Sequence, residues 1–286
     1  MIETLQIIPF PELLSTYRAI FFDSYGVLRN YNGIIPGAEE TIAILRKKDM
    51  PFLVLTNNAA RSPQQAAVRL AQYGLPGIRA ADIITSGSTT RRFLELKVKS
   101  GKVAYLGTPE SADYVLGNRF DSIPVAEVNS AVLAQIKAVA FLDDEGYDLN
   151  SDLSKLVNIL RQRAVPVVVA NTDLLYPVSG SEVAVATGSI AKLIELVLGK
   201  KFIKFGKPSA PMFQLGFDQM SQLLPDLRPN EILMVGDTLQ TDILGGNKFG
   251  LDTALVLSGN TREKTVEYEI SRTGIVPDFI CRSIGQ

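Results

Sequence analysis

Short apolar runs separated by polar stretches recur along the whole chain. The runs rich in Val, Ile, Leu and Phe predict strands, and between most of them apolar residues return every three or four positions, which predicts helices. Continuous apolar strands that alternate with helices indicate an α/β fold built on a parallel sheet with both faces covered. The predicted strands are Ala19–Asp23, Pro51–Asn57, Asp82–Ser86, Val103–Gly107, Val139–Asp143, Val165–Asn171, Glu231–Asp237, Thr253–Ser258 and Phe279–Cys281; the predicted helices include Ala38–Lys48, Pro63–Tyr73, Leu153–Arg163, Ile190–Leu198, Ala210–Leu223 and Thr241–Phe249.

Polar residues directly follow several of the predicted strands. Asp23–Gly26, Thr56–Asn58 and Gly236–Thr238 each follow an apolar run, and Gly206–Pro208 lies between the run Phe202–Phe205 and a predicted helix. In open parallel sheets, ligands bind at the carboxyl ends of the strands. We therefore expect the functional site at this edge of the sheet.

The composition excludes several kinds of catalytic chemistry. The 286 residues include no His, no Trp and one Cys. A Ser-His-Asp triad, a His-ligated metal and an intrachain disulfide are therefore impossible. Catalysis has to use carboxylates, Lys, Tyr, Ser or Thr, backbone amides, or a metal bound by oxygen. The single thiol, Cys281, follows two apolar residues, and we expect it to be a buried strand residue.

Charge and hydropathy indicate a globular protein with small partners. Lys and Arg (29) nearly balance Asp and Glu (30), and no basic block offers a surface to nucleic acid or to an anionic membrane. Met1–Tyr17 lacks the basic region of a signal peptide, and no apolar run approaches the roughly 20 residues of a membrane span. We expect a cytoplasmic protein without nucleic-acid or membrane partners.

The residues at the strand ends fit phosphoryl transfer, which needs a nucleophile, neutralising charges and a metal. Asp23 can attack phosphorus and form an aspartyl phosphate. The Thr56 hydroxyl and the Asn57 backbone N–H, at a predicted strand-to-helix turn, can hold phosphate oxygens. Lys207 adds a positive charge, and Pro208 suits the first position of the following helix.

Asp237 and Asp242 offer carboxylate oxygens, the ligands that Mg²⁺ prefers. Taken singly, each motif has a simpler explanation. An Asp after a strand is more often a turn former or a helix cap, and Asp237 could cap a helix that begins near Leu239.

Together and in this order, the motifs F-F-D-S-Y-G-V-L, V-L-T-N-N, G-K-P and M-V-G-D-T-L-Q-T-D-I closely resemble the four motifs of the haloacid dehalogenase superfamily of hydrolases. The stretch Ala170–Pro177, followed by Thr187-Gly188, is similar to the cap segment of its class IIA branch, which includes sugar phosphatases and p-nitrophenyl phosphatases. The resemblance implies a doubly wound, Rossmann-like parallel-sheet core over residues 1–86 and 190–286, with an inserted α/β cap domain over residues 87–189.

The resemblance also implies roles for individual residues. Thr56, Asn57 and Asn58 would bind phosphate, and Lys207 would act in catalysis. Asp173 would contact the substrate, although a turn beside a capped helix explains it equally well. The set that would hold Mg²⁺ consists of the Asp23 carboxylate, the Tyr25 backbone carbonyl, Asp237 and Asp242. Class IIA relatives often dimerise through the cap, which implies a homodimer.

Tyr25 departs from the pattern of the family, because phosphatases of this superfamily carry a second Asp there as general acid and base. A phenol with a pKa near 10 can donate a proton but is a poor base at pH 7. Three functions stay open. The first is a Mg²⁺-dependent phosphatase of a small phosphorylated metabolite, slowed by Tyr25. The second is a dehalogenase that attacks carbon through Asp23, since true dehalogenases have D-x-Y-G at this place. The third is a phosphate-ligand binding protein without turnover.

Overall fold

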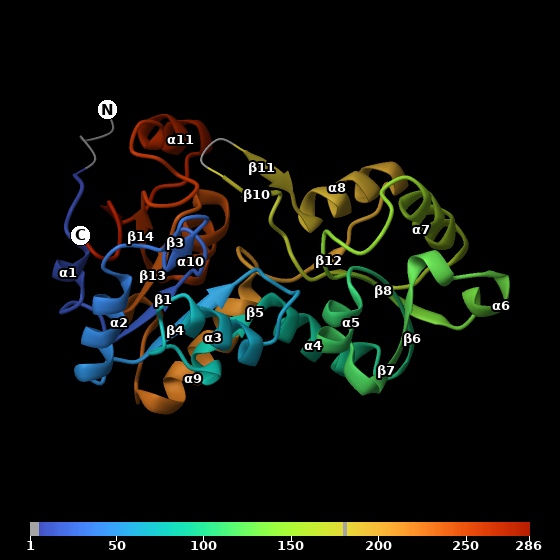
Figure 1. Cartoon of the computed structure of the whole chain (residues 1–286), viewed down its shortest axis with the longest axis horizontal. Coiled ribbons are helices and arrows are strands. Elements are labelled where there is room, and N and C mark those ends of the chain that lie inside the picture. Colours follow the sequence, from blue (N-terminus) through green and yellow to red (C-terminus); the bar gives the residue numbers. More distant parts are fainter. Residues whose placement is uncertain (1–5, 180–181) are drawn as a thin grey trace. The chain divides into compact units, whose positions relative to one another are not determined.

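The computed structural model describes residues 6–179 and 182–286, and they fold into two compact units (Figure 1). The first unit runs to Thr56 and includes Pro63–Ile84 and Lys207–Gln286. The second unit consists of Asn57–Ser62 and Thr85–Gly206.

The observed units differ from the expected division at three segments. Residues 57–62, 85–86 and 190–206 belong to the second unit, whereas the sequence places them in the core. The reason for the last of these segments is local pairing. Strand β12 (Ile203–Lys204) pairs in parallel with β9 (Val167–Val169), and helix α8 (Thr187–Leu198) packs Ala191 and Ile194 into the apolar core of the same unit.

The first unit is built on a sheet with the strand order β15-β14-β13-β1-β4-β5. Numbered along the chain and read from the β5 edge, this order is 3-2-1-4-5-6. It is the doubly wound order, whose ligand crevice lies where the order reverses. Here the reversal falls between β1 and β13, which are paired in parallel. The strands are β1 (Ala19–Phe22), β4 (Phe52–Thr56), β5 (Ile83–Thr85), β13 (Ile232–Gly236), β14 (Asp252–Val256) and β15 (Phe279–Cys281), with a separate hairpin β2 (Arg29–Asn30) and β3 (Gly33–Ile34).

Helices cover both faces of this sheet. In β1, Ile20 and Phe22 pack in one cluster with residues of α1, α2 and α3, and Phe21 packs in another with Met212 and Phe213 of α9. Burial on both faces explains why the strand is apolar throughout. The helices of the unit are α1 (Phe10–Leu13), α2 (Ala38–Lys47), α3 (Pro63–Gln72), α9 (Ala210–Leu223), α10 (Leu244–Phe249) and α11 (Val266–Thr273), with a π-helical turn at Leu239–Ile243.

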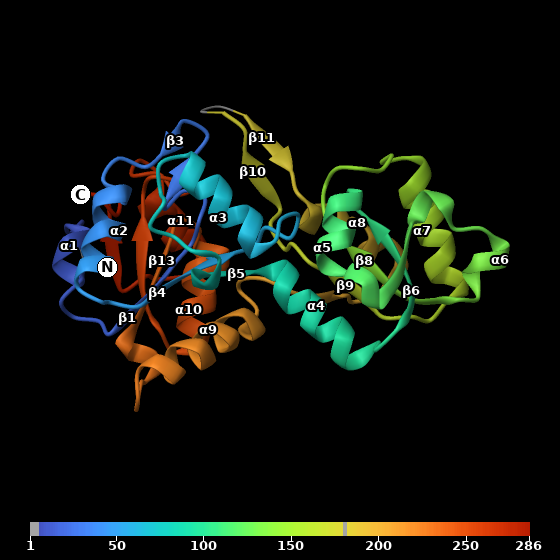
Figure 2. The same cartoon turned by 60° about the horizontal axis from the view of Figure 1, so that its bottom comes forward.

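The second unit has its own sheet, in the order β12-β9-β8-β6-β7. In the chain order of this unit that is 5-4-3-1-2, a second doubly wound arrangement. Figure 2 shows α5 on one side of its strands and α7 on the other. The elements are β6 (Gly101–Leu106), β7 (Phe120–Pro124), β8 (Ile136–Phe141), β9 and β12, the hairpin β10 (Leu175–Pro177) and β11 (Val183–Val185), and the helices α4 (Ser86–Lys97), α5 (Pro109–Val115), α6 (Ser130–Leu133), α7 (Ser151–Gln162) and α8.

The α/β class and each predicted strand are confirmed. The segment predicted as helix Thr241–Phe249 is helical throughout, first in the π-helical turn and then in α10. The prediction of Pro208 at the first helical position is wrong. Helix α9 begins at Ala210 after Ser209, so the proline in its first turn is Pro211 and not Pro208. No helix in the described part of the chain combines the length and apolar character needed to cross a membrane.

Candidate active site

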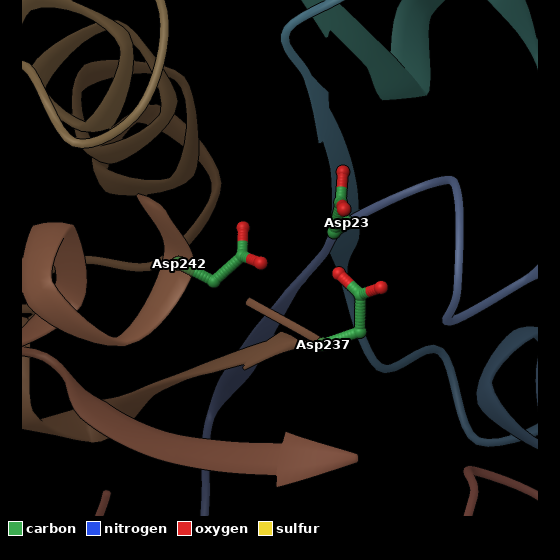
Figure 3. Close-up of side chains that lie close together, drawn as sticks. All are labelled: Asp23, Asp237 and Asp242. Atoms are coloured by element: carbon green, nitrogen blue, oxygen red, sulfur yellow. The ribbon is translucent and has the colours of Figure 1, made fainter. Parts of the chain in front are cut away.

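Three carboxylates converge at the reversal point of the first sheet. Asp23 directly follows β1, Asp237 directly follows β13, and Asp242 lies on the π-helical turn. One carboxylate oxygen from each lies within 4.8 Å of the others, and Figure 3 shows the side chains pointing toward a common centre. The side chain of Asp242 is fully buried and that of Asp23 is only 14 % exposed.

Lys207 joins these carboxylates at the end of the segment that precedes α9. Its Nζ lies 2.6 Å from Asp23 Oδ1 and 2.7 Å from Asp242 Oδ1, and the side chain is 2 % exposed. A buried ammonium needs such partners, because an unpaired charge in this position would be strongly destabilising. The lysine therefore holds the candidate nucleophile and the helical carboxylate at fixed positions.

Backbone and hydroxyl donors fix the other carboxylate oxygens. Asp237 accepts hydrogen bonds from the Asn260 backbone N–H at 2.7 Å and from the Thr238 hydroxyl at 2.9 Å. The Thr238 backbone N–H donates to Asp242 Oδ2 at 3.1 Å. Asp237 and Asp242 are thus oriented by the turn that lies between them and by the loop after β14.

Glycines make room for Asp237. A Cβ placed on Gly26 would lie 2.0 Å from Asp237 Oδ2, and one on Gly259 would lie 1.9 Å from the same atom. Gly26 also adopts a φ of +84°, a conformation that favours glycine. Any larger residue at either position would displace the carboxylate.

Burial changes the acidity of these groups. It raises the pKa of Asp237 to about 7, with the nearby Asp242 charge acting in the same direction. Burial also raises the pKa of Asp23 well above its ordinary value, although Lys207 opposes this effect. For Lys207 burial alone would lower the pKa, but Asp23 and Asp242 outweigh it, so the pKa lies above its ordinary value and the side chain stays protonated.

The residues present fit a divalent cation. Three carboxylates and one ammonium leave a formal charge of −2 among buried groups when all are ionised. The donors are all oxygens, which hard divalent cations select. Burial, and after it the charge of Asp242, raises the pKa of Asp237, and a bound cation would oppose both effects.

Tyr25, the residue that departs from the family pattern, is held by Arg29. The Arg29 guanidinium lies over the Tyr25 ring, 5.3 Å from its centroid, and also over the ring of Tyr73 at 5.5 Å. Burial raises the pKa of the Tyr25 phenol, while Arg29 and the Tyr31 backbone act in the opposite direction with smaller effect. The phenol is therefore protonated at neutral pH.

The predicted helix N-terminus at Thr56–Asn58 is absent. Thr56 is the last residue of β4, but α3 begins only at Pro63. The exposed Asn58 instead closes a local turn, because its Oδ1 accepts the Ala60 backbone N–H at 3.0 Å. The Asn57 N–H therefore lies in a loop, and no helix terminus contributes to anion binding there.

Asn57 and Asp173 meet within the second unit. The Asn57 Nδ2 donates to Asp173 Oδ1 at 2.8 Å and to Thr172 Oγ1 at 3.2 Å. The site residues thus form two groups. Asp23, Lys207, Asp237 and Asp242 assemble in the first unit, and Asn57 with Asp173 in the second.

Sequence reasoning missed the loop after β14. Gly259 and Asn260 line Asp237, yet Ser258–Asn260 was not among the candidate motifs. The signal was present, because this polar, glycine-containing segment follows an apolar strand in the same way as the motifs that were recognised.

Family comparison places these residues in context. The profile of the haloacid dehalogenase-like hydrolases matches residues 20–120, and a HAD-hydrolase-like profile matches residues 204–285. Each match contains part of the acidic site, Asp23 in the first and Lys207, Asp237 and Asp242 in the second.

Individual relatives match nearly the whole chain. Chronophin from Mus musculus is 30 % identical over 289 residues, which covers 96 % of this chain and 92 % of the relative. Glycerol-3-phosphate phosphatase from Gallus gallus is 29 % identical over 289 residues, covering 95 % and 91 %. The crystal structure of a possible sugar phosphatase of the HAD superfamily from Cytophaga hutchinsonii has 47 % identity and a TM-score of 0.95, covering 99 % of each chain.

Proposed function

Because this chain belongs to the haloacid dehalogenase-like hydrolases, we propose that it is a Mg²⁺-dependent phosphatase of small phosphate esters that works through an aspartyl phosphate on Asp23. The observation that carries the proposal is the buried group of three carboxylates and Lys207, with its formal charge of −2. Family membership makes the protein a hydrolase, and the relatives reported above that act on phosphate esters support a phosphatase.

Each charged residue of the site has a separate role in the proposal. Asp23 attacks phosphorus, and Lys207 keeps its carboxylate oriented and neutralises charge on the transferred group. Asp23, Asp237 and the Tyr25 carbonyl would hold Mg²⁺, which would supply positive charge to the phosphate. Asp242 acts mainly by orienting Lys207, because its Oδ1 pairs with the ammonium and its Oδ2 accepts the Thr238 N–H.

The remaining site residues bind the ester in this proposal. We assign the Thr56 hydroxyl and the Asn57 N–H to the phosphate oxygens, with Asn58 holding the turn, and Asp173 to the leaving group. A carboxylate accepts hydrogen bonds, so an alcohol leaving group with further hydroxyls suits Asp173. A relative named for glycerol 3-phosphate and one described as a possible sugar phosphatase fit that substrate class.

Tyr25 limits the second half of the reaction. Its protonated phenol can donate to the leaving oxygen. Because its pKa is raised, the resulting phenolate regains a proton from solvent at neutral pH, and the phenol then cannot take a proton from the attacking water. Hydrolysis of the aspartyl phosphate is then slower than its formation.

The excess buried charge argues against the dehalogenase mechanism, which attacks carbon and needs no metal. A panel of phosphate esters, including glycerol 3-phosphate and p-nitrophenyl phosphate, assayed with Mg²⁺ and with EDTA tests the proposal. We expect turnover with Mg²⁺ only. Release of halide from 2-haloacids without metal, or an equal rate in EDTA, would contradict it.

The remaining expectations concern assembly and location. We propose a homodimer formed through the second unit, where Leu175, Val183 and Val185 on the β10–β11 hairpin are more than half exposed. Sedimentation of the protein and of Val183→Glu tests this, since the charge should dissociate the dimer. The cytoplasm remains our proposal for its location.

A further inference from the structure

The side chain of Asn57 does something different from its backbone. In the proposed function the Asn57 N–H binds phosphate, but the side-chain amide faces the Asn171–Asp173 segment and donates to both Thr172 and Asp173. These partners are more than a hundred positions away in sequence, at separations of 115 and 116. Asn57 is 3 % exposed, so these hydrogen bonds are buried.

Different contacts hold the backbone and the side chain of Asn57. The Asn57 carbonyl accepts the hydroxyl of Ser86 at 2.7 Å, and Ser86 is itself fully buried. A Cβ on Gly206 would lie 2.6 Å from Asn57 Oδ1, so this glycine, with a φ of +101°, gives the amide its space. Few side-chain rotations are compatible with these contacts.

The backbone of Asp173 is held as well. Its N–H donates to Asn171 Oδ1 at 2.9 Å, and its carbonyl accepts the N–H of Gly188 in the first turn of α8 at 3.0 Å. A Cβ on Gly188 would lie 2.5 Å from that carbonyl oxygen. With the backbone held in this way, the bond from Asn57 fixes the position of one carboxylate oxygen, Oδ1.

We propose that Asn57 is a positioning residue, whose side-chain amide turns the Asp173 carboxylate so that it accepts hydrogen bonds from hydroxyl groups of the leaving group. This inference rests on the proposed phosphatase function. One residue then serves phosphate through its backbone and substrate preference through its side chain. The two roles are separable, since every non-proline residue at position 57 keeps the N–H.

A double-mutant cycle on Asn57 and Asp173 tests the inference. Asn57→Asp replaces the donor by a second carboxylate, and in Asn57→Asp/Asp173→Asn the amide and the carboxylate change places. We measure kcat and KM for glycerol 3-phosphate and p-nitrophenyl phosphate, together with inhibition by inorganic phosphate. The ratio of the two kcat/KM values reports substrate preference, and the phosphate inhibition constant reports the phosphate site alone.

Asn57→Asp should lower kcat/KM for glycerol 3-phosphate relative to p-nitrophenyl phosphate by about 10-fold or more, mainly through KM, as expected for loss of a hydrogen bond to a charged group. The double variant, in which the pair still carries one carboxylate, should regain most of this preference, and its inhibition by phosphate should stay within about 3-fold of the wild type because the backbone is intact. Ser86→Ala is the matched control, since it removes a bond to Asn57 without touching Asp173, and it should keep the preference.

Additive effects in the cycle would overturn the role of Asn57, and so would an equal loss for both esters together with weakened phosphate inhibition. A Ser86→Ala variant with the same altered preference would assign the effect to the loop as a whole and would likewise overturn it. Absence of wild-type turnover with any ester would instead overturn the proposed function itself.

Discussion

Single residues account for the chemistry that we propose, and Lys207 shows how closely they depend on one another. Its ammonium contacts two carboxylates at 2.6 and 2.7 Å, so removing it leaves the nucleophile without its orienting charge.

Asp23→Asn should abolish phosphatase activity, because an amide cannot form the phosphoenzyme. Lys207→Ala should reduce kcat by about 10²- to 10³-fold, the effect of removing one donor to transition-state charge. Steady-state assays with p-nitrophenyl phosphate check both. Cys281→Ser is the control and should keep full activity. Its thiol is buried, and burial raises the pKa of the thiol to about 12, so it is unreactive at neutral pH. Retained activity in Asp23→Asn would refute the covalent mechanism.

Tyr25→Asp should raise steady-state turnover of p-nitrophenyl phosphate by about 10-fold or more, because it supplies the missing base. The wild type should show a burst of p-nitrophenol in rapid-quench experiments, since phosphorylation of Asp23 outpaces hydrolysis. Melting temperatures are measured alongside, because the variant loses the contact of the phenol ring with Arg29. A wild type without a burst and a variant without a gain would show that another step limits the reaction.

At the scale of elements, the loop after β14 helps to position the carboxylate of Asp237. Gly259 and Asn260 hold Asp237 although neither carries a charge. Loops of this kind hold site residues in defined positions because they follow rigid, buried strands.

Gly259→Ala should weaken Mg²⁺ binding by about 10-fold or more, as its methyl group would displace Asp237, a change comparable to losing the support of a metal ligand. Gly274→Ala is the matched control. Gly274 ends α11 at a φ of +67° and has no neighbour within 4 Å of an added Cβ, so the variant should lose stability but keep its metal affinity. Calorimetric titration with Mg²⁺ distinguishes the two variants. Equal affinities would show that Gly259 does not position Asp237 for metal binding.

The sequence predicted the central elements well because burial leaves a strong pattern. Strand β1 is apolar at each position and is fully buried. The hairpin β10–β11 was not predicted, since it is largely exposed and its short strands lack a buried face. The contact of Asn57 with Asp173 could not be predicted either, because it joins residues 116 positions apart and no local periodicity encodes it.

At the scale of the whole molecule, the acidic site couples metal binding to pH. Burial raises the pKa of Asp237 to about 7, whereas the unfolded chain has an ordinary carboxyl group. Between pH 4 and 7 the metal-free folded protein therefore keeps a proton that the unfolded chain has lost. Its free energy of unfolding should fall as the pH rises through this range and level off above it.

Mg²⁺ should reverse this trend, because it binds the ionised carboxylate and displaces the proton. We expect the increase in melting temperature on adding millimolar Mg²⁺ to be small at pH 5.5 and to grow until about pH 8. Thermal unfolding of the wild type and of Asp237→Asn across this range checks the prediction. The variant lacks the titrating group, so its Mg²⁺ effect should be weak at every pH; a strong effect in the variant would place the metal elsewhere.

The insertion of the second unit also affects how the chain folds as it leaves the ribosome. Ala19 of β1 pairs with Ile232 of β13, and the segment Thr85–Gly206 is synthesised between them. Its other neighbour, β4, follows soon after β1, but at about 5–20 residues per second roughly 10–40 s pass before β13 exists. During that interval the inserted unit can complete its own sheet, while β1 keeps an apolar edge unpaired and prone to aggregation. Lys207 and Asp237 are also synthesised long after Asp23, so the proposed nucleophile lacks its charged partners during that interval.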